Sequence, residues 1–281
     1  MIIWLASYPK SGNTWVRSII SALLYSNDGI FNFKLLSKID QFPEKKYFKD
    51  SVKDFSKFSE IKKNWILEQD RVNLDNKIKL FKTHQGNFTV ENDSFTNKEN
   101  TLAIIYVVRD PRNLVKSISN HYTLTLSKAL NFLLTPRIIG NGKSRDEDPR
   151  GLFNLLGKWN DHYHSWTKYK ENLLIIKYED LIKNPENELF KIIEFLKRYL
   201  KIETNEQKNE KILKTTSFSN LKKMEEEGQF FEYAKNKSTK DKVNFFHLGP
   251  ENKWQDILDK KIISEIEKNF YKEMRELDYL K

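Results

Sequence analysis

The sequence predicts an α/β fold, with a central parallel sheet flanked by helices. Short apolar runs that are typical of buried strands alternate with segments whose apolar residues recur at helical spacing. Such alternation is the pattern of parallel sheets whose crossover helices cover both faces. No linker rich in Pro, Ser or Gly and no internal repeat divides the 281 residues, so we expect one domain, residues 1–281. The four strand-like runs are residues 2–6, 78–82, 102–108 and 173–177.

The first run leads into a loop that suits an anion. Residues 2–6 are followed by Tyr-Pro-Lys-Ser-Gly-Asn-Thr-Trp at 8–15 and then by a helical pattern. A strand, a tight turn and a helix present backbone N–H groups and the positive end of a helix dipole, which both favour an anion. The triphosphate-loop pattern G-x-x-x-x-G-K-[ST] is not met, because Ser7 replaces its first Gly and Lys10 precedes Gly12. We therefore expect an anion other than a Mg-bound triphosphate.

The next two runs also end in polar side chains. Residues 78–82 lead to His84, and residues 102–108 lead to Arg109, followed by a Pro at the predicted start of a helix. In open α/β sheets ligands bind beyond the carboxyl ends of the strands, so these residues are expected to converge on one cleft.

The remaining segments carry weaker signals. Residues 27–64 are polar with scattered aromatic residues and are expected to pack over the sheet. Residues 135–150 read as a long loop of the kind that often forms a lid. An aromatic-rich helix is expected over 151–169, and surface helices over 205–227 and 255–271.

Composition limits the function classes. The absence of cysteine excludes disulfides and Cys-ligated metals, and no apolar run reaches the length of a membrane helix. The N-terminal residues lack the pattern of a signal peptide, so we expect a cytoplasmic protein without a transmembrane segment. The net charge of +10 comes from lysines that acidic residues balance locally, as over 222–227, so no nucleic-acid partner is expected.

Two motifs together resemble those of a known family. The octet at 8–15 resembles the 5′-phosphosulfate loop of the cytosolic-type sulfotransferases, which bind 3′-phosphoadenosine 5′-phosphosulfate (PAPS). Residues 103–111, with Arg109 and the later Ser117, resemble the family's 3′-phosphate motif. The resemblance runs in order from residue 2 to about residue 271. It implies a P-loop-like sulfotransferase fold, PAPS as co-substrate, adenosine 3′,5′-bisphosphate (PAP) as product, and no metal.

Four further segments resemble family motifs. Residues 82–84 match a Lys-Thr-His motif, 178–180 a Tyr-Glu-Asp motif and 216–218 a Thr-Ser-Phe motif. Residues 159–166 resemble a Trp-x-x-His-x-x-x-Trp helix that borders the acceptor pocket.

The resemblance implies a role for each matching residue. His84 would be the general base, a role that suits a histidine, and Lys10 and Lys82 would stabilise the transition state. Trp159 and His162 would contact the acceptor. The residues implied in cofactor binding are Lys10, Ser11, Gly12, Asn13, Thr14, Trp15, Arg109, Ser117, Tyr178, Thr216, Ser217, Phe218, His247, Leu248 and Gly249.

The chain departs from the family pattern near residue 247. The family usually has Arg-Lys-Gly-x-x-Gly-x-Trp there, gripping the 3′-phosphate, whereas this chain has His247 in place of Arg and Asn252 in place of the second Gly. Because histidine is mostly neutral at pH 7, this clamp is expected to be weaker or to use backbone groups.

Other functions remain open from sequence. A P-loop-type nucleotide kinase would need Mg²⁺ ligands, for which Asp110 is the only candidate at a strand end. A non-catalytic nucleotide-binding module is a further alternative, against which Lys82 and His84 argue. The acceptor is open among small molecules such as phenols and steroids, sugars, and lipids, because a fold does not decide its substrate.

Overall fold

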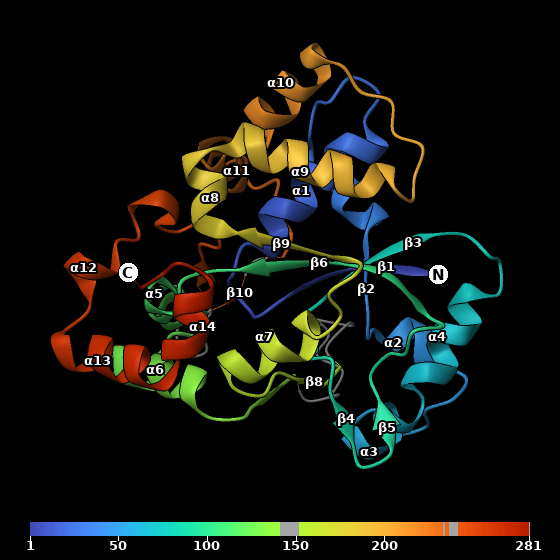
Figure 1. Ribbon diagram of the computed structural model, residues 1–281, viewed down its shortest axis with the longest axis horizontal. Coiled ribbons are helices and arrows are strands. Elements are labelled where there is room, and N and C mark those ends of the chain that lie inside the picture. The colour runs from blue at the N-terminus through green and yellow to red at the C-terminus, as the bar shows by residue number, and fades with distance from the viewer. Residues whose placement is uncertain (141–151, 233, 236–240, 281) are drawn as a thin grey trace. The chain divides into compact units, whose positions relative to one another are not determined.

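The computed structural model describes residues 1–140, 152–232, 234–235 and 241–280 (Figure 1). The chain divides into two compact units, each assembled from three segments. The first unit comprises residues 1–8, 39–106 and 136–175, and the second comprises 9–38, 107–135 and 176–281.

The first unit holds most of the five-stranded sheet, whose strand order is β2-β3-β1-β6-β9. β1 and β3 pair in parallel, with Ile2 opposite Lys79 and Ala6 opposite Thr83, and β2 pairs in parallel with β3. β1 and most of β6 are fully buried, which explains why these strands read as continuous apolar runs. The predicted α/β fold is confirmed. The strands are β1 (Ile2–Ser7), β2 (Asp40–Gln41), β3 (Lys79–Thr83), β6 (Thr101–Val108) and β9 (Leu173–Lys177).

Aromatic rings fill the core of the first unit. The Trp4 ring on β1 lies 5.8 Å from that of Phe42, 5.3 Å from that of Phe95 and 5.9 Å from that of Trp166, measured between centroids. Its other elements are α2 (Lys45–Phe48), α3 (Phe58–Lys63), α4 (Trp65–Asn73), α7 (Trp159–Thr167) and the antiparallel pairs β4 (Thr89–Val90) with β5 (Asp93–Ser94) and β7 (Ile138–Ile139) with β8 (Asn154–Leu155).

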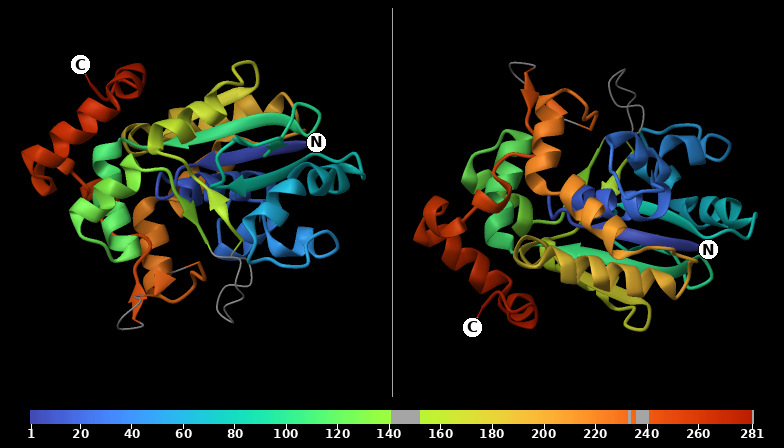
Figure 2. Two further views of the ribbon diagram at one scale, coloured as in Figure 1. Left: turned by 90° about the horizontal axis from the view of Figure 1, so that it is seen from below. Right: turned by 90° about the horizontal axis from the view of Figure 1, so that it is seen from above.

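The second unit is mainly helical. α1 packs against η1 and α10, and α13 packs against α5 and α6, beside which it lies in both views of Figure 2. Its first elements are α1 (Asn13–Tyr25), η1 (Phe33–Lys38), α5 (Pro111–Tyr122), α6 (Leu126–Leu134), α8 (Tyr178–Lys183), α9 (Pro185–Lys197) and α10 (Glu206–Thr215). The remainder are α11 (Phe218–Glu226), β10 (Ala234–Lys235), β11 (Lys242–Val243), η2 (Gly249–Glu251), α12 (Trp254–Ile257), α13 (Lys260–Asn269) and α14 (Tyr271–Glu276).

Three expected helices are wrong in extent. The helix expected over 151–169 begins only at Trp159, after β8 and a Gly157 whose φ is +65°. The helix expected over 205–227 breaks where the Ser217 side chain caps α11, and the one expected over 255–271 breaks where Asp259 caps α13. Most of the expected loop, residues 141–150, lies outside the described residues. Among the residues described, no helix is long and apolar enough to cross a membrane.

Candidate nucleotide and catalytic sites

The loop before α1 has the backbone of an anion-binding turn. Lys10 and Gly12 both adopt positive φ values, 70° and 105°, and such turns direct successive N–H groups into one concavity. A Cβ atom on Gly12 would lie 2.6 Å from the Tyr178 ring, so only glycine fits there. Gly12 is the N-cap of α1 and makes no side-chain cap, and no acidic residue lies in the first turn. This helix N-terminus can therefore receive an anion.

Three buried donors in the second unit fit a phosphorylated ligand. Lys10 Nζ, Ser11 Oγ and Arg109 Nε are each buried, and across the described residues none of them has a hydrogen-bond partner. Buried polar atoms are normally paired, so orphaned donors on the loop before α1 and on Arg109, which contacts that loop, require an explanation. Phosphate oxygens would satisfy all three, and Lys and Arg are the side chains that proteins use to bind phosphate.

Lys10 is held in an apolar setting. Its Nζ lies 3.4 Å from the centroid of the Phe245 ring. Burial lowers the pKa of Lys10 to about 7; the positive charge of Arg109 lowers it further and Glu225 opposes the change. The Glu225 carboxylate accepts hydrogen bonds from the backbone N–H groups of Phe245 and Phe246, both at 2.8 Å, and so fixes the segment that presents the ring. An anion would favour the charged form of Lys10 and raise this pKa.

Arg109 follows the end of β6 and is 5% exposed. Its guanidinium lies 3.9 Å above the ring of Tyr178, and its Nη1 donates a long hydrogen bond of 3.4 Å to the Lys10 carbonyl. The anion loop, the expected 3′-phosphate residue and the expected adenine residue are thus in direct contact. Ser117 lies on α5, partly exposed.

The rings of Tyr178, Trp15 and Phe218 form a continuous aromatic cluster. The Trp15 ring meets the rings of Tyr178 and Phe218 edge-on, at 5.4 and 6.1 Å between centroids. Trp15 is 8% exposed, so it serves the core as well as any ligand. Thr216 and Ser217 precede Phe218, where Thr216 Oγ1 donates to the Ile212 carbonyl and Ser217 Oγ accepts from the N–H of Asn220. Asn13 and Thr14 are also buried, in the first turn of α1.

The segment with His247, Leu248 and Gly249 approaches the Phe218 ring. Gly249 has a φ of +55°, and a Cβ there would lie 2.2 Å from the Phe218 ring. Burial lowers the pKa of His247, and the charges of Lys116, Lys222 and Lys10 lower it further. His247 is therefore mostly neutral at pH 7.

His84 belongs to the first unit, just after β3. Its Nδ1 lies 2.9 Å from the carbonyl oxygen of Ser7, which can only accept, so Nδ1 carries a proton. In the neutral ring the basic lone pair is then on Nε2. Lys82 lies two residues earlier on β3, opposite Leu5 of β1, and is 9% exposed.

His162 lies behind His84 and has both ring nitrogens engaged. Its Nε2 lies 3.1 Å from the His84 carbonyl oxygen and its Nδ1 lies 2.9 Å from the Tyr106 hydroxyl. Burial lowers the pKa of His162 to about 3, so the ring is neutral: Nε2–H donates to His84 and Nδ1 accepts from Tyr106.

The acceptor contacts expected of α7 stay a prediction. His162 and Trp159 are both 0% exposed, and His162 has no ring nitrogen left for an acceptor. The helix instead packs its aromatic side inward, where Trp159 stacks on Tyr163. Through its Nε2, His162 supports the backbone of His84.

The structure groups the expected residues into two sets. All the expected nucleotide residues lie in the second unit, whereas His84, Lys82, Trp159 and His162 lie in the first. Sequence reasoning missed Ser7, Tyr106, Glu225 and Phe245. Ser7 and Tyr106 gave no signal inside apolar strands, and Glu225 lies in a charged run; Phe245, two residues before His247, could have been found only by its position.

Comparison with known proteins agrees with these observations. The model of the sulfotransferase domain family matches residues 2–278. Over 226 residues the chain is 24% identical to rabbit (Oryctolagus cuniculus) amine sulfotransferase, covering 78% of this chain and 62% of that protein. It is 28% identical over 223 residues to mouse (Mus musculus) sulfotransferase 1 family member D1, covering 78% of this chain and 65% of that protein. The matches thus span less than two thirds of these relatives' length.

Solved structures give the same family. A mouse sulfotransferase complexed with PAP aligns over 98% of this chain and 84% of that chain, with 25% identity and a TM-score of 0.59. A retinol dehydratase in a complex with retinol and PAP aligns over 97% and 81%, with 18% identity and a TM-score of 0.57, a likeness of fold. With a family model that matches nearly all of its length, the chain belongs to the sulfotransferase family.

Proposed function

We propose that this chain is a PAPS-dependent sulfotransferase that transfers a sulfuryl group to a hydroxyl or amine of a small-molecule, sugar or lipid acceptor. The observation that carries the proposal is the set of buried, unpartnered donors of Lys10, Ser11 and Arg109 beside an uncapped helix N-terminus. Relatives named for amines and for 3-alpha-hydroxysteroids support acceptors of both kinds. A cytoplasmic location stays a prediction, in keeping with a relative named as cytosolic.

The roles of the residues follow from their chemistry. PAPS would supply the sulfuryl group, and Lys10, Ser11 and the first turn of α1 would bind its 5′-phosphosulfate. Arg109 and Ser117 would bind the 3′-phosphate. His84 Nε2 would take the proton of the acceptor group as its oxygen or nitrogen forms the bond to sulfur and the bond from sulfur to the phosphate oxygen breaks. Lys10 and Lys82 would stabilise the charge that develops.

Nucleotide binding tests the proposal directly. PAP should bind more tightly than ADP in calorimetry, because only PAP has the 3′-phosphate that Arg109 and Ser117 would contact. EDTA should leave PAP affinity unchanged, because lysine and arginine provide the positive charge. Equal affinities for PAP and ADP, or Mg-dependent turnover of ATP, would contradict the proposal and favour a nucleotide kinase.

Turnover is tested by incubating the protein with labelled PAPS and a panel of amines, phenols, steroids, sugars and lipids. Mass spectrometry should find a product heavier by one sulfuryl group. His84→Ala should lower the transfer rate about 100-fold or more, the usual contribution of a positioned base, while PAP affinity stays nearly unchanged. His164→Ala, on the same helix as His162, is the matched control and should retain activity. Near-normal transfer by His84→Ala would show that the base is another group.

A further inference from the structure

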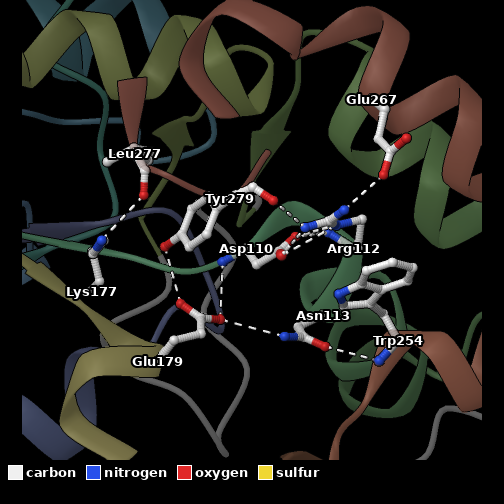
Figure 3. Close-up of polar contacts among 9 residues, drawn as sticks. All are labelled: Asp110, Arg112, Asn113, Lys177, Glu179, Trp254, Glu267, Leu277 and Tyr279. Carbon is white, nitrogen blue, oxygen red and sulfur yellow. Dashed lines mark hydrogen bonds and ion pairs between the residues drawn. The ribbon is translucent and has the colours of Figure 1, made fainter. Parts of the chain in front are cut away.

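A partly buried polar network connects the end of β6 to the segment after α14 (Figure 3). The backbone N–H of Asp110, the residue after Arg109, donates to Glu179 Oε1 at 3.2 Å. The hydroxyl of Tyr279 donates to Glu179 Oε2 at 3.0 Å. Glu179 thus joins residues 69 and 100 positions away in the chain. All three lie in the second unit, with the expected nucleotide residues.

Glu179 helps to hold two dipeptides, residues 109–110 and 178–179, against each other. Arg109 and Asp110 are consecutive residues of one dipeptide, and Tyr178 and Glu179 are those of the other. The Arg109 guanidinium stacks on the Tyr178 ring while the Asp110 N–H bonds to Glu179. Among the residues that the structure describes, Arg109 makes no ion pair, and its one hydrogen bond is the long one to Lys10. The direction of its guanidinium therefore depends on the stacking and on the backbone that Glu179 holds.

Tyr279 is the donor in its contact with Glu179. Burial raises the pKa of Glu179; the Arg109 charge opposes that rise, and the Asp110 carboxylate adds to it. Burial also raises the pKa of Tyr279 well above its ordinary value, so its hydroxyl keeps the proton that it donates. Without this bond, Glu179 would keep a buried carboxylate oxygen without its donor, which is costly.

A second set of contacts fixes the segment that carries Tyr279. Arg112 Nη2 donates to the Tyr279 carbonyl at 2.8 Å and pairs with Asp110 at 2.7 Å, and its Nη1 pairs with Glu267 at 2.7 Å. The Arg112 guanidinium also lies 4.1 Å from the Trp254 ring. Lys177 Nζ donates to the Leu277 carbonyl at 3.2 Å. Residues 277–279 are thus anchored by Arg112 on α5 and by Lys177 at the end of β9.

We propose that Glu179 and Tyr279 are positioning residues for Arg109, and that they determine how strongly the site prefers a nucleotide with a 3′-phosphate. The proposal rests on the proposed function, because it takes Arg109 as the 3′-phosphate ligand. Tyr279 would hold the carboxylate, the carboxylate would hold the strand end, and the strand end would aim the guanidinium.

The test compares two nucleotides that differ only in the 3′-phosphate. Calorimetry gives the Kd of PAP and of adenosine 5′-monophosphate, and their ratio measures the preference. Tyr279→Phe should lower the ratio about 3- to 10-fold, the size of the net contribution of a typical hydrogen bond. Glu179→Ala should lower the ratio further, and Glu179→Gln should restore part of the loss, because its amide oxygen can still accept from Asp110. Tyr271→Phe, on a 61% exposed tyrosine of α14, is the matched control and should leave the ratio unchanged.

Arg109→Ala gives the lowest ratio expected, because it removes the proposed 3′-phosphate ligand itself. In that background Tyr279→Phe should not lower the ratio further, because the residue that it positions is absent. Circular dichroism checks that each variant is folded. If Glu179→Ala does not fold, Tyr279→Phe and Glu179→Gln are enough to test the proposal. A Tyr279→Phe variant that keeps the wild-type ratio, or weakens both nucleotides equally, would overturn the proposal. A wild-type protein with no preference for PAP would instead contradict the proposed function.

Discussion

Lys10 combines a strained backbone with a desolvated charge. It has a positive φ of 70°, which is rare outside glycine, and burial lowers the pKa of its ammonium to about 7. Strain and perturbed pKa values both concentrate at functional sites, and here they fall on one residue. At pH 8 Lys10 is mostly neutral before any ligand binds, whereas a bound phosphate would favour the ammonium.

PAP binding should therefore take up a proton at pH 8. The phosphates of PAP are already ionised at that pH, so uptake of up to about one proton would come from the protein. Affinity should fall as pH rises above about 7 and level off below it, where Lys10 is protonated before binding. Calorimetry in two buffers of different ionisation enthalpy measures the uptake.

Two variants assign the proton to its residue. Lys10→Met should remove the uptake along with part of the affinity. Lys214→Met, which removes an exposed charge in the last turn of α10, should leave the uptake unchanged. Undiminished uptake in Lys10→Met would show that another group accepts the proton.

At the scale of elements, we expect the segment over 245–249 to act in the proposed site through its shape instead of its charge. Phe245 covers Lys10, His247 is neutral, and Gly249 allows the backbone to approach Phe218 closely. An Arg in place of His247, as in the family pattern, would have given the segment a permanent positive charge. The contacts of Glu225 with Phe245 and Phe246 hold one end of the segment, and the close approach of Gly249 to Phe218 constrains the other.

Gly249→Ala should weaken PAP binding about tenfold or more, equivalent to about 1.4 kcal/mol. The added Cβ would lie 2.2 Å from the Phe218 ring and would displace the ring, the segment or both. Gly228→Ala is a matched control, because Gly228 also has a positive φ, 79°, yet nothing lies within 4 Å of its added Cβ. Both variants should lose about 1 kcal/mol of folding free energy from backbone strain, but only Gly249→Ala should lose affinity. Calorimetry and thermal unfolding separate the two effects, and equal PAP affinities in both variants would contradict this role.

Four of the five strands of the central sheet were predictable from sequence, whereas β2, the short antiparallel strands and several helices were not. Parallel strands buried on both faces read as continuous apolar runs, so the run at 102–108 became β6, Thr101–Val108. The apolar residues near 152–156 gave the same signal as a helix, but they contribute to β8 and lead to Gly157, whose positive φ precludes a continuous helix. Periodicity does not distinguish a short buried strand from part of a helix.

In the candidate site, too, some residues were predictable from sequence and others were not. Residues in compact motifs, such as Lys10 and Arg109, could be named from sequence because each follows a strand end. The partners that set their properties come from distant positions, as Phe245 does for Lys10 and Tyr279 does for Glu179. No local pattern predicts such contacts, because only the tertiary fold brings these residues together.

The whole molecule carries a net charge of +10, which two different ligand classes could use. Exposed lysines would attract a nucleic acid along many phosphates, whereas Lys10 Nζ and Arg109 Nε are buried and would contact a small ligand. These two modes of binding differ in their response to salt. Surface contacts release counterions and weaken steeply, while interactions with buried charges are screened much less.

PAP affinity should therefore change little with salt, by less than about tenfold between about 50 and 200 mM. Any binding of a mixed-sequence RNA should weaken by about a thousandfold over the same range, as expected for six or more phosphate contacts. Fluorescence anisotropy with labelled RNA and calorimetry with PAP measure the two dependences. Lys214→Met should leave PAP affinity intact at every salt concentration, while Arg109→Ala should lower it throughout, because only Arg109 is expected to contact PAP. If RNA bound tightly at about 200 mM salt and competed with PAP, the positive charge would serve a nucleic acid, and the sulfotransferase assignment of this site would have to be revised.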